Sequence, residues 1–316
     1  MKHILIDADT GIDDSVAILY ALKSPNIHVE GIVTCFGNSG AVQSADNSLR
    51  LVKISHCGYH VPVVVGSNLS IDGEYEEGQP DIHGRNGIGN VQLPEPDYPA
   101  LDVDPSDFII QEAKDLDGEV IIVSTGRMTN LANALMKEPK LPKMVKKLVS
   151  MGGSLHVPGN VSEHAEANIY GDARAADMVM RAGFNMLLVG LDVTTKTFMT
   201  QEVIDKTRKH VREDCVDSLN YIEQALQFYF DFHRRGEGML EKSFTHDPLA
   251  VLLAEDPTLG IYEMIRASVE YKAEDYKGKI LTDFRFHPDY NHEAIAYCIQ
   301  VNSDKAIRRL FSVFQK

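Results

Sequence analysis

Apolar and polar positions follow two different patterns along this chain. Continuous apolar runs of about four to eight residues predict buried strands, and apolar residues spaced three or four positions apart predict helices with one buried face. The predicted strands are 4–6, 28–40, 61–67, 119–124, 148–153, 186–195, 261–271, 279–288 and 294–301. The predicted helices are 16–22, 41–56, 105–116, segments starting at 131, 173 and 247, two within 201–235, and 304–314.

This alternation of strands and helices predicts an α/β fold. Parallel strands need helical crossovers, and those helices cover both faces of the sheet. The chain has 316 residues, of which 44% are hydrophobic, enough for one large core. We therefore predict an open, mostly parallel sheet flanked by helices, with a Rossmann-type core, in a single domain spanning 1–316.

One long segment, 68–99, shows neither of these patterns. It is rich in Gly, Pro and acidic residues and contains the sequence DIHGRNGIGN. A loop of this length in a compact domain is usually functional or disordered. We predict a mobile cover that brings the imidazole of His83 to a site, with a solvated surface histidine as the alternative.

Polar side chains and one methionine lie where the predicted parallel strands end. These residues are Asp7, Asp9, Asn38, Thr125 and Met151. Ligands of open parallel sheets bind outside the carboxyl ends of the strands. The pattern therefore predicts one site at one rim of the sheet.

The turn DADTGIDD carries the densest negative charge at that rim. Asp7, Asp9, Asp13 and Asp14 lie within eight positions, with no Lys or Arg between them. Two carboxylates about 5 Å apart repel by roughly 3 kcal/mol at an effective dielectric near 20. A bound cation is the simplest compensation, because helix capping would explain Asp13 or Asp14 but not all four.

The spacing of this acidic turn narrows the choice of ion. It does not match an EF-hand loop, since Gly11 and Ile12 stand at the fifth and sixth positions. Aspartyl-phosphate phosphatases also end a strand in Asp-x-Asp, but they place Thr or Val where Gly11 stands, so that interpretation is weakened and stays open. Oxygen ligands without Cys or His favour Ca²⁺ or Mg²⁺ over Zn²⁺.

Two later segments carry further candidate residues. In the polar segment 152–172, amides and a carboxylate suited to sugar hydroxyls stand at Asn160, Glu166 and Asn168, although Asx turns would explain them equally. Asp247 is predicted to cap a helix that begins at Pro248, and its carboxylate could also reach a metal. His246 gains nothing from capping. The aromatic residues at 228–232 are either core or a wall for stacking a base.

Composition excludes several partners. A net charge of −15 argues against nucleic-acid and anionic membrane surfaces, which recruit Lys and Arg. The four cysteines form no C-x-x-C pair, no apolar run approaches a membrane span, and the first strand leaves no room for a signal peptide. We expect a cytoplasmic protein.

The octapeptide DADTGIDD followed by an apolar helix resembles the amino-terminal signature of the nucleoside hydrolases, which split nucleosides into base and ribose at a Ca²⁺ site. Thr10 stands where that signature usually has Pro. The resemblance extends in order through Asn38, the His-Gly pair at His83, Thr125, Met-Gly-Gly at 151–153, the 160–168 tract and His246-Asp247.

This resemblance implies a role for each matching residue. Asp9, Asp14, Asp247 and the backbone carbonyl of Thr125 would hold Ca²⁺, and Asp9 would also act as general base toward a water at the ion. Sugar hydroxyls would be held by Asp13, Asn160, Glu166 and Asn168, near Met151. Asn38 would position water and sugar, Asp7 would support the metal carboxylates, and His246, with His83 nearby, would assist the leaving base.

The implied reaction is hydrolysis of the N-glycosidic bond of inosine- or uridine-type ribonucleosides, without a covalent enzyme intermediate. Members restricted to purines stack the base between tryptophans, and this chain has no Trp. Ala167 stands where relatives often have a bulky aromatic residue. The resemblance also implies a homodimer or homotetramer. A Mg²⁺-dependent phosphatase of the aspartyl-phosphate type and a non-catalytic nucleoside or ribose binder remain alternatives.

Overall fold

The computed structural model describes residues 1–75, 77–285 and 292–316. Eight strands form the central sheet in the order β3-β2-β1-β4-β5-β6-β12-β9. Every neighbouring pair is parallel except β12 with β9, which is antiparallel. The prediction of an open, mostly parallel sheet is confirmed. In chain order the sheet strands are β1 (Lys2–Ala8), β2 (Ile27–Thr34), β3 (Val63–Val64), β4 (Val120–Ser124), β5 (Lys147–Met151), β6 (Met186–Val189), β9 (Gly260–Ile265) and β12 (Ile295–Val301).

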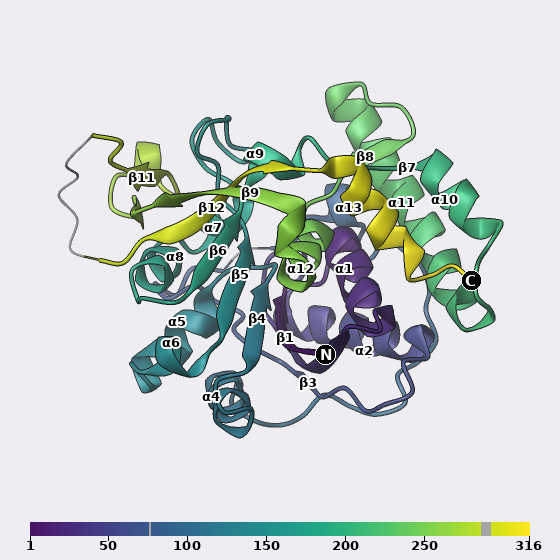
Figure 1. Ribbon diagram of the computed structural model, residues 1–316, viewed down its shortest axis with the longest axis horizontal. Coiled ribbons are helices and arrows are strands. Elements are labelled where there is room, and N and C mark those ends of the chain that lie inside the picture. The colour runs from purple at the N-terminus through teal and green to yellow at the C-terminus, as the bar shows by residue number, and fades with distance from the viewer. Residues whose placement is uncertain (76, 286–291) are drawn as a thin grey trace.

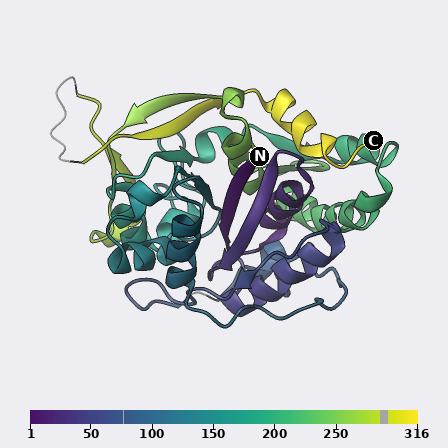
Figure 2. The ribbon, with the colours of Figure 1, turned by 60° about the horizontal axis from the view of Figure 1, so that its bottom comes forward.

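Helices cover both faces of this sheet (Figure 1). One face carries α1 (Ile12–Lys23), α2 (Ala41–Ser55), α11 (Val216–Glu237), α12 (Asp247–Glu255) and α13 (Ser303–Ser312). The other carries α4 (Pro105–Asp115), α5 (Thr129–Lys137), α6 (Leu141–Met144) and α8 (Ala173–Met180). Figure 2 shows these two groups on either side of the purple strands β1 and β2.

The alternation of side chains along the strands creates these two cores. In β1, Ile4 and Ile6 pack against the helices of the α1 face, and Leu5 between them packs against those of the α4 face. Successive side chains of a strand point to opposite faces, so a continuous apolar run fits a strand covered on both sides.

Shorter elements connect and extend this framework. The remaining helices are α3 (Pro80–His83), α7 (Ala167–Gly171), α9 (Leu191–Thr194), α10 (Gln201–Arg208) and three 3₁₀ turns, Glu213–Cys215, Pro257–Leu259 and Glu274–Tyr276. Two antiparallel ribbons pair β7 (Phe198–Thr200) with β8 (Lys242–Phe244) and β10 (Ala267–Val269) with β11 (Ile280–Thr282). In the described ranges, no helix is both long and apolar enough to cross a membrane.

Several boundaries differ from the sequence prediction. The strand predicted at 186–195 ends at Val189 and is followed by helix α9, and that predicted at 261–271 is divided between β9 and β10, which belong to different sheets. The strand predicted at 61–67 is reduced to β3, and that at 279–288 to β11, with 286–288 outside the described residues. The predicted cap of α12 is wrong: His246 is the N-cap residue and Asp247 is the first helical residue. The Asp247 side chain faces other carboxylates instead of its own helix terminus.

Candidate active site

The acidic turn connects β1 to α1 at the carboxyl edge of the sheet. Asp13 and Asp14 lie in the first turn of α1, and Asp14 Oδ2 accepts a hydrogen bond from the Gly11 N–H at 2.8 Å. This contact satisfies a free amide of the helix terminus, as capping predicts. Asp14 Oδ1 accepts a hydrogen bond from the Thr125 hydroxyl at 2.7 Å, so this carboxylate also links the first turn of α1 to the end of β4.

Asp13, Asp14 and Asp247 form what we call the acidic cluster. Each is buried, and each offers one oxygen within 4.8 Å of the others. Burial, and then the Asp14 charge, raises the pKa of Asp13 to about 7, and burial with the neighbouring carboxylates also raises the pKa of Asp247 well above its ordinary value. Among the described residues, Asp13 Oδ1 is buried and meets no hydrogen-bond donor.

This donor set fits a divalent cation. Three buried carboxylates repel one another, and an uncompensated buried oxygen costs free energy. A hard ion with oxygen ligands would relieve both costs. Of the carboxylates expected to hold the ion, Asp14 and Asp247 belong to this cluster, with Asp247 arriving from α12, while Asp13 takes part in it and Asp9 does not.

Asp9 lies beside the acidic cluster and accepts hydrogen bonds from Arg127 and Asn38. Arg127 Nη1 donates to Asp9 Oδ2 at 2.6 Å, as does the Asn38 backbone N–H at 3.0 Å. The Asn38 side-chain amide donates to Asp9 Oδ1 at 3.2 Å and to Asp14 Oδ2 at 3.0 Å. Burial raises the pKa of Asp9 well above its ordinary value, and the Arg127 charge opposes that rise.

Sequence reasoning missed Arg127. The residue stands in TGRMTN, directly after Thr125 and Gly126, and it is the first cation after β4. A charged residue immediately beyond a buried strand whose end belongs to a predicted site was the signal that could have identified it. Asp7, at the end of β1, is buried, and its Oδ1 accepts a hydrogen bond from Asn130 Nδ2 at 2.8 Å.

The 160–168 tract forms the next part of the rim. Asn168 Nδ2 donates to the Thr125 carbonyl at 2.7 Å and lies 3.4 Å from the Met151 carbonyl. Glu166 caps α7 and also accepts from the Gly153 N–H at 2.9 Å, and Asn160 Oδ1 accepts from the Ala167 N–H at 3.0 Å. These contacts fix the tract across the ends of β4 and β5.

A cavity of about 200 Å³ opens above these groups. The sequence-predicted residues that line it are Asp13, Asn38, His83, Thr125, Met151, Asn160, Glu166, Asn168, His246 and Asp247, together with Arg127. Asp9 and Asp14 are buried beside it. The prediction that these polar positions converge on one rim is confirmed.

Two imidazoles face this cavity from opposite segments. His83 ends α3, and its Nδ1 accepts from the Ile12 N–H at 3.1 Å, which ties the long loop to the start of α1. His246 Nδ1 lies 2.8 Å from the Thr194 hydroxyl. Burial lowers the pKa of each to about 3. Loss of hydration dominates both shifts.

Comparison with known proteins agrees with this geometry. The family model described as inosine-uridine preferring nucleoside hydrolase matches residues 4–308. The chain belongs to that family. It is 36% identical to the probable uridine nucleosidase 1 of Oryza sativa subsp. japonica over 252 residues, 78% of this chain and 74% of the relative. The chain is therefore a nucleoside hydrolase, an enzyme of the N-glycosyl hydrolase class.

Solved structures resemble this nucleoside hydrolase over nearly its whole length. A plant nucleoside hydrolase, the PpNRh1 enzyme, superposes with a TM-score of 0.92 at 30% identity, covering 99% of both chains. The purine-preferring ribonucleoside hydrolase of Gardnerella vaginalis gives 0.91 at 32% identity, covering 99% of this chain and 98% of that one.

The aromatic residues of α11 divide between core and cavity in this nucleoside hydrolase. Tyr229 and Phe232 line the cavity, while Phe230 packs in the core. The Tyr229 hydroxyl lies 3.5 Å from Asp13 Oδ2. His233 and Glu237, one and two turns beyond Tyr229, also line the cavity and were not identified from the sequence. Core packing is therefore shown for Phe230 and also for Tyr229, and stacking of a base on Tyr229 and Phe232 stays a prediction.

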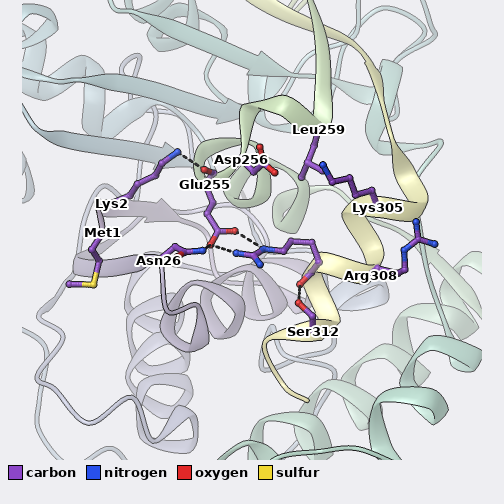
Figure 3. A pocket seen from close by; sticks show the side chains of 10 residues that line it. Met1, Lys2, Asn26, Glu255, Asp256, Leu259, Lys305, Arg308 and Ser312 are labelled. Atoms are coloured by element: carbon purple, nitrogen blue, oxygen red, sulfur yellow. Dashed lines mark hydrogen bonds and ion pairs between the residues drawn. The ribbon is translucent and has the colours of Figure 1, made fainter. Parts of the chain in front are cut away.

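A second hollow, of about 720 Å³, lies at the opposite edge of the sheet, where β1 begins and α12 ends (Figure 3). Lys2 Nζ donates to the Ala254 carbonyl at 2.8 Å, and Glu255 accepts from Arg309 at 3.0 Å and from Asn26 at 3.1 Å. These groups satisfy one another and hold the end of α12. The hollow is thus explained by helix packing and is remote from the acidic cluster.

Proposed function

We propose that this nucleoside hydrolase cleaves inosine- and uridine-type ribonucleosides to free base and ribose. The observation that carries the proposal is a small cavity lined together by buried carboxylates, amides, imidazoles and aromatic rings. Carboxylates and amides suit sugar hydroxyls, and imidazoles and aromatic rings suit a departing base. A phosphatase of the aspartyl-phosphate type is less favoured, since the nucleoside hydrolase family model matches residues 4–308.

We propose Ca²⁺ as the ion, held by Asp9, Asp14, Asp247 and the Thr125 carbonyl. The all-oxygen donor set supports a hard cation, and the uncompensated Asp13 oxygen supports a positive charge nearby. When bound, the ion would orient water and lower the pKa of that water.

The remaining chemistry belongs to the side chains. Asp9 Oδ1 would accept a proton from the attacking water as general base. Asp13 and Asn168 would hold ribose hydroxyls, Asn160 and Glu166 the 5′-hydroxyl end, and Asn38 would place the water and sugar. The carboxylates would stabilise positive charge developing on the sugar.

The base would leave toward His246. Desolvation keeps this imidazole neutral when no ligand is bound, so it would act by hydrogen bonding through a ring N–H. We propose that the Thr194 hydroxyl donates to Nδ1, which would place the ring N–H on Nε2, where it would donate a hydrogen bond to the departing base as negative charge develops there. His83 and Tyr229 would hold the base from the side.

One assay tests the proposed reaction. The enzyme with Ca²⁺ is incubated with inosine, uridine, cytidine, adenosine and their deoxy forms, and reducing sugar is measured. We expect sugar release from inosine and uridine and loss of activity in chelator that Ca²⁺ restores. Binding of nucleosides by calorimetry without sugar release would identify a binder instead.

The Asp9→Ala variant tests the role of Asp9 as general base. Removing a general base that also supports the ion should lower kcat by about 10³-fold or more. The matched control is Asp104→Ala, which removes a helix cap and an exposed ion pair with Lys137, costs about 1 kcal/mol of stability and should leave kcat unchanged. Undiminished turnover by Asp9→Ala would remove Asp9 from this role.

Assembly and location are proposed separately. We propose a homodimer or homotetramer, which light scattering on the purified chain measures directly. All four cysteines are free thiols, which supports a reducing compartment such as the cytoplasm.

A further inference from the structure

The side chain of Arg127 is held in one place by its surroundings. It is only 2% exposed, and its guanidinium lies 5.4 Å above the Phe36 ring. Two glycines make room for it: a Cβ at Gly37 would overlap Nη1, and a Cβ at Gly171 would overlap Nε. An arginine enclosed in this way has little freedom to follow a ligand.

The two oxygens of Asp9 differ in the hydrogen bonds that they accept, because this guanidinium donates to only one of them. Oδ2 receives Arg127 Nη1 at 2.6 Å and the Asn38 N–H at 3.0 Å. Within the described part of the chain, Oδ1 receives only the Asn38 side-chain amide, at a longer 3.2 Å and shared with Asp14. Oδ2 therefore has both lone pairs engaged, and Oδ1 keeps one available.

We propose that Arg127 is a positioning residue that anchors Oδ2 of Asp9, so that Oδ1 alone is presented to the ion and to the attacking water. The inference rests on the proposed function, in which Asp9 is the general base. A carboxylate free to rotate beside the acidic cluster would turn either oxygen, or both, to a divalent ion, and no lone pair would be held in a fixed direction toward the attacking water. Anchoring one oxygen prevents that arrangement.

The test compares Arg127→Met with Arg127→Lys, using Arg50→Met as the matched control. Arg50 is also paired with two carboxylates, but on the outer side of α2. Each variant is assayed for kcat and KM on inosine and on 4-nitrophenyl β-ribofuranoside, whose leaving group needs no proton. Calcium affinity is measured by calorimetry at one pH, and thermal melting verifies folding.

For Arg127→Met we expect kcat to fall by about 10²-fold, because small misplacement of a catalytic group has that effect. KM should stay within about threefold, and the loss should be equal on both substrates, since water attack and not base departure is impaired. Arg127→Lys should recover part of the loss. Ca²⁺ should bind Arg127→Met about tenfold more tightly, because a fixed positive charge is removed and both Asp9 oxygens become available.

Different results would overturn the proposal. A raised KM with unchanged kcat would make Arg127 a substrate-binding residue, and unchanged calcium affinity would show that it does not restrain Asp9. If Arg127→Met fails to fold, Arg127→Lys with partial activity and intermediate affinity supports the proposal, while wild-type values oppose it. If the wild type cleaves no nucleoside, the proposed function fails, and the calcium titration still decides whether Arg127 restrains Asp9.

Discussion

At the scale of single residues, the cavity is lined by both imidazoles and buried carboxylates. Desolvation, together with the nearby His233, lowers the pKa of His246 to about 3. Burial has the opposite effect on Asp13, whose pKa rises to about 7. Both groups are thus driven toward neutrality by the same loss of hydration. A ligand or ion that enters the cavity must therefore supply the hydrogen bonds or the opposite charge that water would otherwise give these groups.

The His246→Ala variant tests the leaving-group role at this scale. We expect kcat on inosine to fall by about 10²-fold, since general acid assistance typically contributes 10²–10⁴-fold. Activity on 4-nitrophenyl β-ribofuranoside should change by less than about threefold, because that leaving group departs without a proton. Equal losses on both substrates would show that His246 serves the sugar or the ion instead.

At the scale of elements, the site depends on how β2 leads into its following turn. Gly37 has φ of +154° and lies against the Asp9 carboxylate and the Arg127 guanidinium, where a Cβ would overlap both. The turn can therefore approach the ion pair closely only because residue 37 has no side chain. The same turn presents Asn38 to Asp9 and Asp14.

The Gly37→Ala variant should accordingly displace the Asp9 to Arg127 pair. We expect at least about a 10²-fold loss of kcat and a lower melting temperature. Gly183→Ala is the matched control, since Gly183 has φ of +87° but nothing within 4 Å of an added Cβ. The control should lose some stability through backbone strain and keep its kcat. Similar kinetics for the two variants would contradict the close-contact explanation.

At the scale of the whole molecule, the buried carboxylates couple folding to pH and to metal. Burial raises the pKa values of Asp7 and Asp13 to about 7, above the ordinary value of 3.8 that the unfolded chain has. Between these limits each of these carboxyl groups holds a proton in the folded protein that the unfolded chain has released, so its contribution to stability is lost as pH rises from about 4 to 7. The lowered pKa values of His83 and His246 act in the opposite direction up to about pH 6.5, and above that pH the loss from the carboxyl groups is not offset by them. A bound cation favours the ionised carboxylates and opposes this loss.

Thermal melting at pH 5 and pH 8, with chelator and with Ca²⁺, measures this coupling. We expect the metal-free enzyme to melt at a lower temperature at pH 8, and Ca²⁺ to raise the melting temperature more at pH 8 than at pH 5. In Asp13→Asn, which has no charge to lose, the dependence on pH should be weaker. A metal-free melting temperature that is constant or rises between these pH values would contradict the coupling.

Local signals in the sequence were sufficient for most elements. The continuous apolar runs of β1 and β4 and the start of α4 at Pro105 are determined by neighbouring residues, and these predictions are confirmed. The cap of α12 was predicted wrongly because Asp247 is the first helical residue and its side chain faces the carboxylates of α1, which are distant in sequence. Arg127 was missed because its partner Asp9 lies 118 positions away in sequence.

The sequence by itself determined the parallel sheet, the rim at which its strands end, and the residue types gathered there, because periodicity and strand termini are local properties of the chain. Only the tertiary structure decided which carboxylates share a space, which oxygen of Asp9 is occupied, and that burial keeps His246 neutral. Those outcomes depend on distances and hydration set by segments far apart in the chain.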